Sequence, residues 1–194
     1  MPTDSVRTLT SLASLAWIVV GGYGLWGILA EDSGDNWQTP YLIFAGALFL
    51  GAALTVAAVW SVSRRDERSP TRVIGLGVCA VGLLSTLVAW ALPLWMTILA
   101  IGYAVVAVSG QHPWRRSVAL LAGAQLLGMA AMFVGIVAEV GRRDEYGDRP
   151  VAFGIGIVVT AGATVVSLHQ LDRSINAHRA IAGTRESGAN ALTS

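Results

Sequence analysis

The sequence predicts an all-α fold, a polytopic transmembrane bundle of six helices joined by short loops. Hydrophobic residues make up 54% of the 194 residues, charged residues only 13%, and the mean hydropathy is +0.61. A soluble domain usually carries about 25% charged residues, because its surface faces water. Six apolar stretches approach the roughly 20 helical residues that cross a bilayer core. The spans are expected at residues 9–30, 41–63, 73–92, 94–109, 117–140 and 151–169.

The first two spans are separated by a polar, acidic loop at residues 31–36. The apolar run 9–30 is longer than the roughly 7–15 residues of a signal-peptide core, so we interpret it as a span that is retained. Trp17 lies well inside this span, where we expect it to pack against another helix. The second span, 41–63, ends directly before Arg64.

The third and fourth spans come from one apolar run, residues 73–109. A single helix of that length would measure about 55 Å, nearly twice the hydrocarbon thickness of a bilayer. Pro93 is the natural break, since proline suits the first turn of the helix that follows it. The alternative is one kinked helix, which would leave five spans. Six spans agree better with the distribution of the arginines.

The last two spans, 117–140 and 151–169, are followed by a segment of different character. Residues 170–183 predict an amphipathic helix that lies along the inner membrane surface or packs under the bundle. Gly183 is a plausible helix end, and the small, polar residues 184–194 predict a disordered tail. The apolar positions at helical spacing are Leu168, Leu171, Ile175 and Ala182.

The arginines orient the chain. All 13 basic residues are arginine, and basic residues are enriched in cytoplasmic loops. Cytoplasmic N- and C-termini, in the inner membrane of a prokaryotic cell, place ten arginines inside and leave only Arg142, Arg143 and Arg149 outside. Tryptophan prefers the headgroup level, and six of the seven tryptophans fall near a predicted interface. Trp26, Trp37, Trp90 and Trp95 lie on the outer side, Trp60 and Trp114 on the inner side.

Small residues recur one helical turn apart within the spans, and the chain contains 22 glycines. Such faces let helices approach closely in lipid, where no hydrophobic force drives them together. Packing within the bundle is the favoured interpretation. The alternative is a contact with a second copy or with another membrane protein. The pairs are Ala47 with Gly51, Ala124 with Gly128, and Ala131 with Gly135.

Gln125 is the most informative single residue, because an amide near mid-membrane needs a partner. In the sixth span Thr160, Thr164 and Ser167 share one helical face. A hydrogen bond from Gln125 to this face would stabilise the bundle by about 0.6–2 kcal/mol. We favour a structural contact. The alternative is a polar pathway for a small solute, lined by these four residues.

Other chemistry has little support in the sequence. No charged residue lies near the predicted midplane, which disfavours an ion-coupled pump. The acidic loop 31–36 lacks the spacing of a calcium loop, the single cysteine lies within the third span, and no catalytic or nucleotide-binding motif is present. We therefore expect no enzymatic activity, cofactor, metal or nucleic-acid partner. Metal or haem ligation by the histidines is a minor alternative, because the sequence does not predict that two of them come together. The histidines are His112, His169 and His178.

A weak internal similarity relates residues 45–53 to residues 122–130. A repeat of three spans would place the two halves in opposite directions, as in many transporters. The function that the sequence favours is a small multi-pass protein with a structural or interaction role in the cell membrane. A small solute transporter or channel near Gln125, Thr160 and Thr164 is the alternative, and a membrane enzyme comes third.

Overall fold

The computed structural model describes six helices, and no strand occurs in the part of the chain that it describes. The described residues are 3–29, 38–64, 69–88, 94–109, 114–140 and 151–191. The predicted acidic loop 31–36 and the predicted break at Pro93 lie outside these residues. The helices are α1 (Thr3–Leu29), α2 (Gln38–Ser63), α3 (Pro70–Val88), α4 (Leu94–Ser109), α5 (Trp114–Val140) and α6 (Val151–Ala191).

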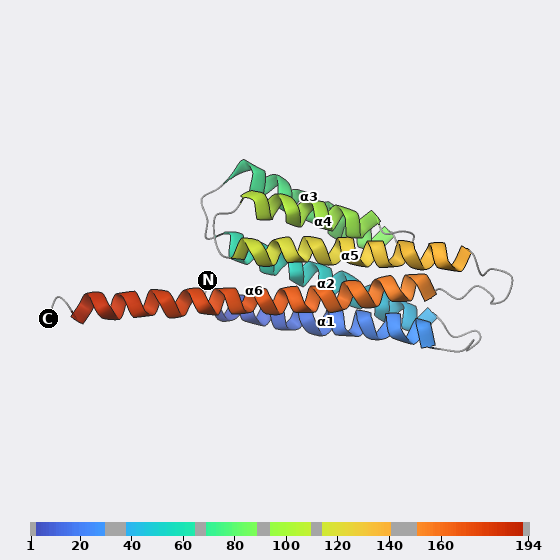
Figure 1. The fold of residues 1–194 in the computed structure, drawn as a ribbon, viewed down its shortest axis with the longest axis horizontal. Coiled ribbons are helices and arrows are strands. Elements are labelled where there is room, and N and C mark those ends of the chain that lie inside the picture. Colours follow the sequence, from blue (N-terminus) through green and yellow to red (C-terminus); the bar gives the residue numbers. More distant parts are fainter. Residues whose placement is uncertain are drawn as a thin grey trace.

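The helices form a bundle in which each packs against its neighbours in the chain, and α6 closes the ring by packing against α1 (Figure 1). Successive helices run in opposite directions along the long axis of the bundle. Both termini therefore lie at the same end, and α6 extends beyond the other helices there (Figure 1). The predicted all-helical bundle is confirmed.

Four of the described helices are long and apolar enough to cross a membrane. Their apolar segments are Ser5–Trp26, Leu42–Ser63, Trp114–Val137 and Phe153–Ala177, and shorter ones occur at Pro70–Thr86 and Leu94–Ser109. Many large apolar side chains point away from the core, as expected of a protein surrounded by lipid. The most exposed include Leu15, Leu42, Val73, Phe133, Val134 and Val137.

Helices α3 and α4 form an antiparallel pair, so the apolar run 73–109 is not one helix. A Cβ atom added to Gly75 would lie 2.9 Å from the backbone nitrogen of Val106, and one added to Gly82 would lie 3.1 Å from that of Leu99. Backbones that come this close pack along their length.

Trp95, which the sequence placed at the outer headgroup level, lies instead in the protein interior. Its side chain is only 2% exposed, and its ring stacks on that of Trp17 with centroids 6.5 Å apart. Trp17 lies midway along α1, so α4 starts closer to the middle of the bundle than the point where α1 ends. The correction follows from the short α4, which has 16 residues and is only about 24 Å long.

Helix α6 runs without interruption through Gly183 to Ala191, beyond the helix end that the sequence suggested at Gly183. Residues 192–194 of the predicted disordered tail lie outside the described residues. Glycine inside a helix costs about 1 kcal/mol relative to alanine, a penalty that a 41-residue helix can absorb. The amphipathic segment is likewise a continuation of the sixth span. Its first turn packs against the bundle, since Leu171 is fully buried.

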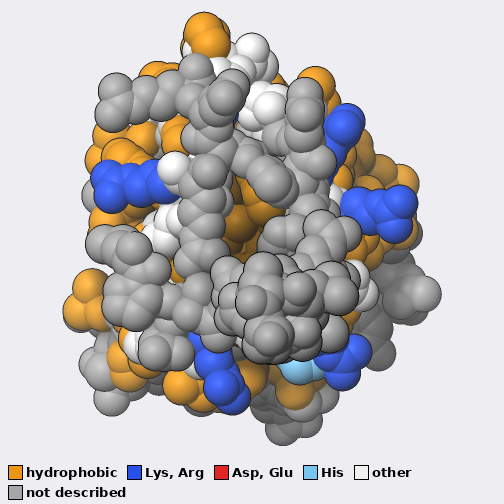
Figure 2. All heavy atoms as spheres, turned by 90° about the vertical axis from the view of Figure 1, so that its left-hand side faces the viewer, with side chains coloured by type: hydrophobic (Ala, Val, Ile, Leu, Met, Phe, Trp, Pro, Cys, Tyr) orange, Lys and Arg blue, Asp and Glu red, His pale blue; other side chains and the backbone are white. Residues whose placement is uncertain are grey.

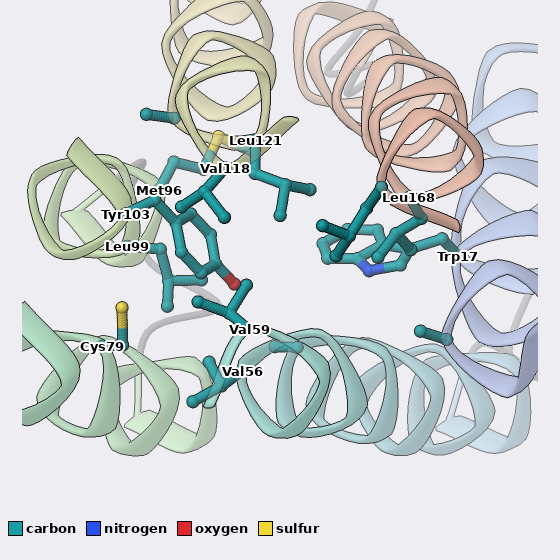
Figure 3. Close-up of a cluster of buried hydrophobic side chains, with 14 of the residues drawn as sticks. Trp17, Val56, Val59, Cys79, Met96, Leu99, Tyr103, Val118, Leu121 and Leu168 are labelled. Atoms are coloured by element: carbon teal, nitrogen blue, oxygen red, sulfur yellow. The ribbon is translucent and has the colours of Figure 1, made fainter. Parts of the chain in front are cut away.

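The core is built from side chains of all six helices, which point into the centre of the ring (Figure 3). Trp17 from α1 is one of its largest members, and its indole Nε1 donates a 3.0 Å hydrogen bond to Thr55 Oγ1 on α2. The prediction that Trp17 packs against another helix is confirmed. The other labelled residues are Val56, Val59, Cys79, Met96, Leu99, Tyr103, Val118, Leu121 and Leu168.

Candidate functional site

The interface between α5 and α6 brings Gln125 and Thr164 together. Gln125 Nε2 donates a hydrogen bond of 3.2 Å to Thr164 Oγ1, and both side chains are fully buried. Gln125 lies about 11 residues past Trp114, hence about 16 Å along α5 and near the middle of its apolar segment. It belongs to a buried stripe at helical spacing that includes Val118, Leu121 and Gly128.

Two glycines allow α5 and α6 to come this close. A Cβ atom added to Gly128 would collide with Thr160 Oγ1, and one added to Gly156 would lie 2.6 Å from Met132 Cβ. Each added atom would also lie 3.1 Å from the carbonyl oxygen of the other glycine. Because the backbones come this close, the Gln125 and Thr164 side chains can meet across the interface.

The other two residues of the predicted polar stripe are satisfied within α6. Thr160 Oγ1 donates to the Gly156 carbonyl oxygen at 2.7 Å and lies 3.8 Å from Met96 Sδ. Ser167 Oγ donates to the Ala163 carbonyl oxygen at 2.8 Å. Hydroxyls in helices commonly bond one turn back in this way. The structure thus unites Gln125 with Thr164, whereas Thr160 and Ser167 bond to their own helix.

The second polar atom of the Gln125 amide has no hydrogen-bond partner among the described residues. Oε1 is buried, yet no described residue places a donor within hydrogen-bond reach of it. A glutamine side chain offers two donors and two acceptor sites, and an unsatisfied buried acceptor is costly. The contact is therefore incomplete, and it is the most distinctive polar feature of the bundle interior.

The part of the chain that the structure describes holds no metal-binding cluster beside this contact. Within the described residues, no group of three His, Cys, Asp or Glu side chains could hold a metal ion. His169 and Asp172 lie near the end where both termini are found, beside a shallow groove between α1 and α6. His169 is exposed there. What the Gln125 contact can do chemically is bind helices together or offer a hydrogen-bond acceptor to a small polar solute.

Basic side chains lie around the periphery of the bundle end that carries both termini (Figure 2). Five of the described ones are exposed, whereas Arg72 at the start of α3 is buried and donates from Nη1 to the Ser63 carbonyl oxygen of α2. Sequence reasoning used Arg72 only as a topological signal and missed this contact. The described arginines at this end are Arg7, Arg64, Arg72, Arg115, Arg116 and Arg173.

Comparison of the chain with protein-family models, with curated proteins and with solved structures finds no match. The features of the molecule that bear on function are therefore the interior contact, the arginine-bearing end and the packing between them.

Proposed function

We propose that this chain is a six-span protein of a prokaryotic inner membrane, with both termini in the cytoplasm and a structural or interaction role without catalysis. The orientation is supported by the arginines. Six of them lie at the end of the bundle that carries both termini, and basic residues are retained on the cytoplasmic side of a membrane.

The short helices α3 and α4 are included among the spans. Their 19 and 16 residues correspond to about 28 and 24 Å, close to the hydrocarbon thickness. A short span is accommodated by local thinning of the bilayer at modest cost. They also pack as an antiparallel pair beside α5, which is one of the long apolar helices.

The observation that carries the proposed role is the apolar interior of the ring, into which buried side chains of the six helices point (Figure 3). Met96, Leu99 and Leu121 are fully buried at its centre, and the Gln125–Thr164 contact is sealed between two touching backbones. A solute pathway needs a polar, hydrated lining, which this packing does not supply. A dry bundle of this kind serves as a membrane scaffold or as a subunit that binds another protein.

The proposed partner is a second copy or another membrane protein, held in the bilayer by the outward faces. The small-residue pair Ala124 and Gly128 is buried against other helices, as is Gly51. Other glycines face outward, where an added Cβ atom would meet nothing within 4 Å. Small outward residues permit close approach of another helix. They are Gly22, Gly46, Gly123 and Gly162.

The second candidate function is a small solute transporter or channel. It is favoured by one observation, the buried Gln125 Oε1 without a hydrogen-bond partner among the described residues. An acceptor held near mid-membrane could be met by a polar solute as it passes. The packed surroundings of this atom make the structural role the better supported of the two.

Proteoliposomes separate these functions. Vesicles that hold the purified protein are exposed to a hyperosmotic step of glycerol or urea, and light scattering follows their shrinkage and re-swelling. The proposed role predicts the same re-swelling rates as protein-free vesicles. Re-swelling that is faster than in protein-free vesicles, and that returns to the protein-free rate with Gln125→Leu, would contradict it in favour of a pathway.

Reporter fusions test the six-span topology independently. An alkaline phosphatase or fluorescent protein domain fused after Asp35, Asp66, Pro113 or Asp144 should report outside, inside, inside and outside, respectively. A C-terminal fusion should report the cytoplasm. A periplasmic C-terminus would contradict the six-span proposal, because an even number of spans returns the chain to its starting side.

A further inference from the structure

An open groove lies between α2 and α3, at the end of the bundle that carries the arginines. Its volume is about 760 Å³. Helix packing is closer in the pairs α1–α6, α3–α4 and α5–α6, where glycines bring the backbones together. The described residues that line the groove are Trp60, Ser63, Arg64, Arg72, Val73, Leu76, Gly77 and Ala80.

Arg72 lines the groove at the start of α3. Ser69 precedes Pro70 at the start of α3, and the Ser69 carbonyl oxygen accepts the backbone hydrogen bonds of Arg72 and Val73 at 3.1 and 3.3 Å. This start is favourable, because proline suits the first helical position, and it fixes Arg72 in the first turn. The Arg72 side chain is 6% exposed and bonds across to the Ser63 carbonyl oxygen. A guanidinium has five N–H donors, and the bond to Ser63 uses one of them.

Arg64 supplies a second positive charge at the mouth of the groove. Its Cζ lies 5.0 Å from the centroid of the Trp60 ring, within the range of a cation–π interaction. The ring thus holds the guanidinium over the groove although Arg64 is exposed. The described lining residues include two arginines and no carboxylate, so an anion is the ligand that complements this end.

The deeper part of the groove is apolar. Val73, Leu76 and Ala80 follow one face of α3, and the rise from Arg72 to Ala80 is about 12 Å. Gly77 faces the groove, and an added Cβ atom there would meet nothing within 4 Å. The groove is therefore cationic at the headgroup level and apolar toward the membrane interior, as a phospholipid requires.

We propose that the groove between α2 and α3 is a binding site for an anionic phospholipid of the cytoplasmic leaflet. The phosphate lies between the guanidinium groups of Arg72 and Arg64, and one acyl chain runs along the wall that contains Leu76 and Gly77. Arginine suits this task because its planar fork pairs with phosphate oxygens. Basic pockets between membrane helices on this side bind anionic headgroups. The inference rests on the membrane orientation proposed above.

Native mass spectrometry of the full-length protein in detergent tests the site. Phosphatidylglycerol and phosphatidylcholine with identical acyl chains are titrated in parallel. The wild type should bind phosphatidylglycerol more tightly, and Arg72→Gln and Arg64→Gln should each weaken this binding by roughly fivefold. The control is Arg116→Gln, which removes an exposed arginine from the same end of the bundle and should leave the affinity unchanged.

Gly77→Leu tests the acyl-chain slot without removing a charge, and it decides the matter if Arg72→Gln does not fold. It should abolish the phosphatidylglycerol adduct. The matched control is Gly123→Leu, at a comparable depth on α5, where an added Cβ also meets nothing within 4 Å; this variant should bind as the wild type does. Equal binding of the two lipids, or unchanged phosphatidylglycerol binding by Gly77→Leu, would overturn the proposal.

A wrong membrane orientation would be recognised by a different result from a wrong lipid site. If reporter fusions placed Arg64 and Arg72 outside, the orientation would be wrong, whereas the lipid affinities measured in detergent would not change. Preferential phosphatidylglycerol binding that is lost in the groove variants supports the site under either topology result. The two proposals are thus tested by separate measurements.

Discussion

The α5–α6 and α2–α3 interfaces join consecutive antiparallel helices, yet one is closed and the other open. At the closed interface Gly128 and Gly156 bring the backbones into contact, and Gln125 reaches Thr164. At the open interface Gly77 faces a groove, and Arg72 bridges to the Ser63 carbonyl oxygen. The closed interface has a glycine on each helix at the same height, whereas an added Cβ atom at Gly77 of the open interface would meet nothing within 4 Å.

This difference also bears on the internal similarity of the sequence. The shift that relates residues 45–53 to 122–130 would make Gly77 the counterpart of Gly154. Gly77 faces open space, whereas a Cβ added to Gly154 would lie 2.8 Å from the Gly24 carbonyl oxygen of α1. Likewise, Gly51 faces α1 and Gly128 faces α6. The matched glycines therefore do not occupy equivalent positions in the bundle.

The largest expected effect is that of Gly128→Leu, which should force the closed interface apart. The new side chain would collide with Thr160 Oγ1 and with the backbone of α6, so α5 would have to move away and Gln125 would lose Thr164. We expect a loss of about 3 kcal/mol or more in the free energy of unfolding, measured by denaturation in mixed detergent micelles. Gly123→Leu, on the open side of the same helix, is the control and should stay within about 0.5 kcal/mol of the wild type. Equal losses in both variants would show that the α5–α6 contact is not close.

A smaller effect is expected when the polar contact is removed and the glycines stay in place. Gln125→Leu should lower the free energy of unfolding by about 0.6–2 kcal/mol, the range for a hydrogen bond between membrane helices. If Gln125 and Thr164 act as a pair, Thr164→Val in the Gln125→Leu background should cost less than it does alone. Strictly additive losses in this double-mutant cycle would mean that the hydrogen bond contributes nothing to the closed interface.

The smallest effect is expected for Gly77→Leu at the open interface. The leucine side chain enters the groove, and leucine has a higher helix propensity than glycine. The free energy of unfolding in a lipid-free detergent should therefore change by less than about 0.5 kcal/mol, although lipid binding is lost. A loss as large as that of Gly128→Leu would show that α2 and α3 are packed together at this height.

The helices themselves could be predicted from the sequence because their apolar runs are long and their breaks are polar or contain proline. The inward position of Gln125 could also be predicted, since an amide near mid-membrane needs a partner. Sequence spacing further placed Thr164 on one face of the sixth span. It could not single out Thr164 from Thr160 and Ser167, because which hydroxyl meets the amide depends on the relative height of two helices.

Other features depend on how the helices sit against one another, which no local pattern records. Trp95 has a sequence position typical of an interfacial tryptophan, but its side chain is buried because its helix is short. The groove beside Arg72 exists because α3 has no facing glycine contact on α2. Gly183 resembles a helix end, yet α6 continues past it. Gly154 and Gly156 each permit a close helix contact, but the sequence does not show with which helix. Gly154 faces α1, and Gly156 faces α5.

The most direct test of the account is the water accessibility of the Gln125–Thr164 contact in the folded protein. In a Cys79→Ala background, Thr164→Cys is treated in membrane vesicles with a small aqueous methanethiosulfonate reagent applied from both sides. Arg116→Cys, at the exposed end of α5, serves as the reactive control. The cysteine at position 164 should stay unlabelled while the control reacts fully, because the closed interface excludes water. Labelling at position 164 at the rate of the control would contradict a dry interior and make a solute pathway the better explanation.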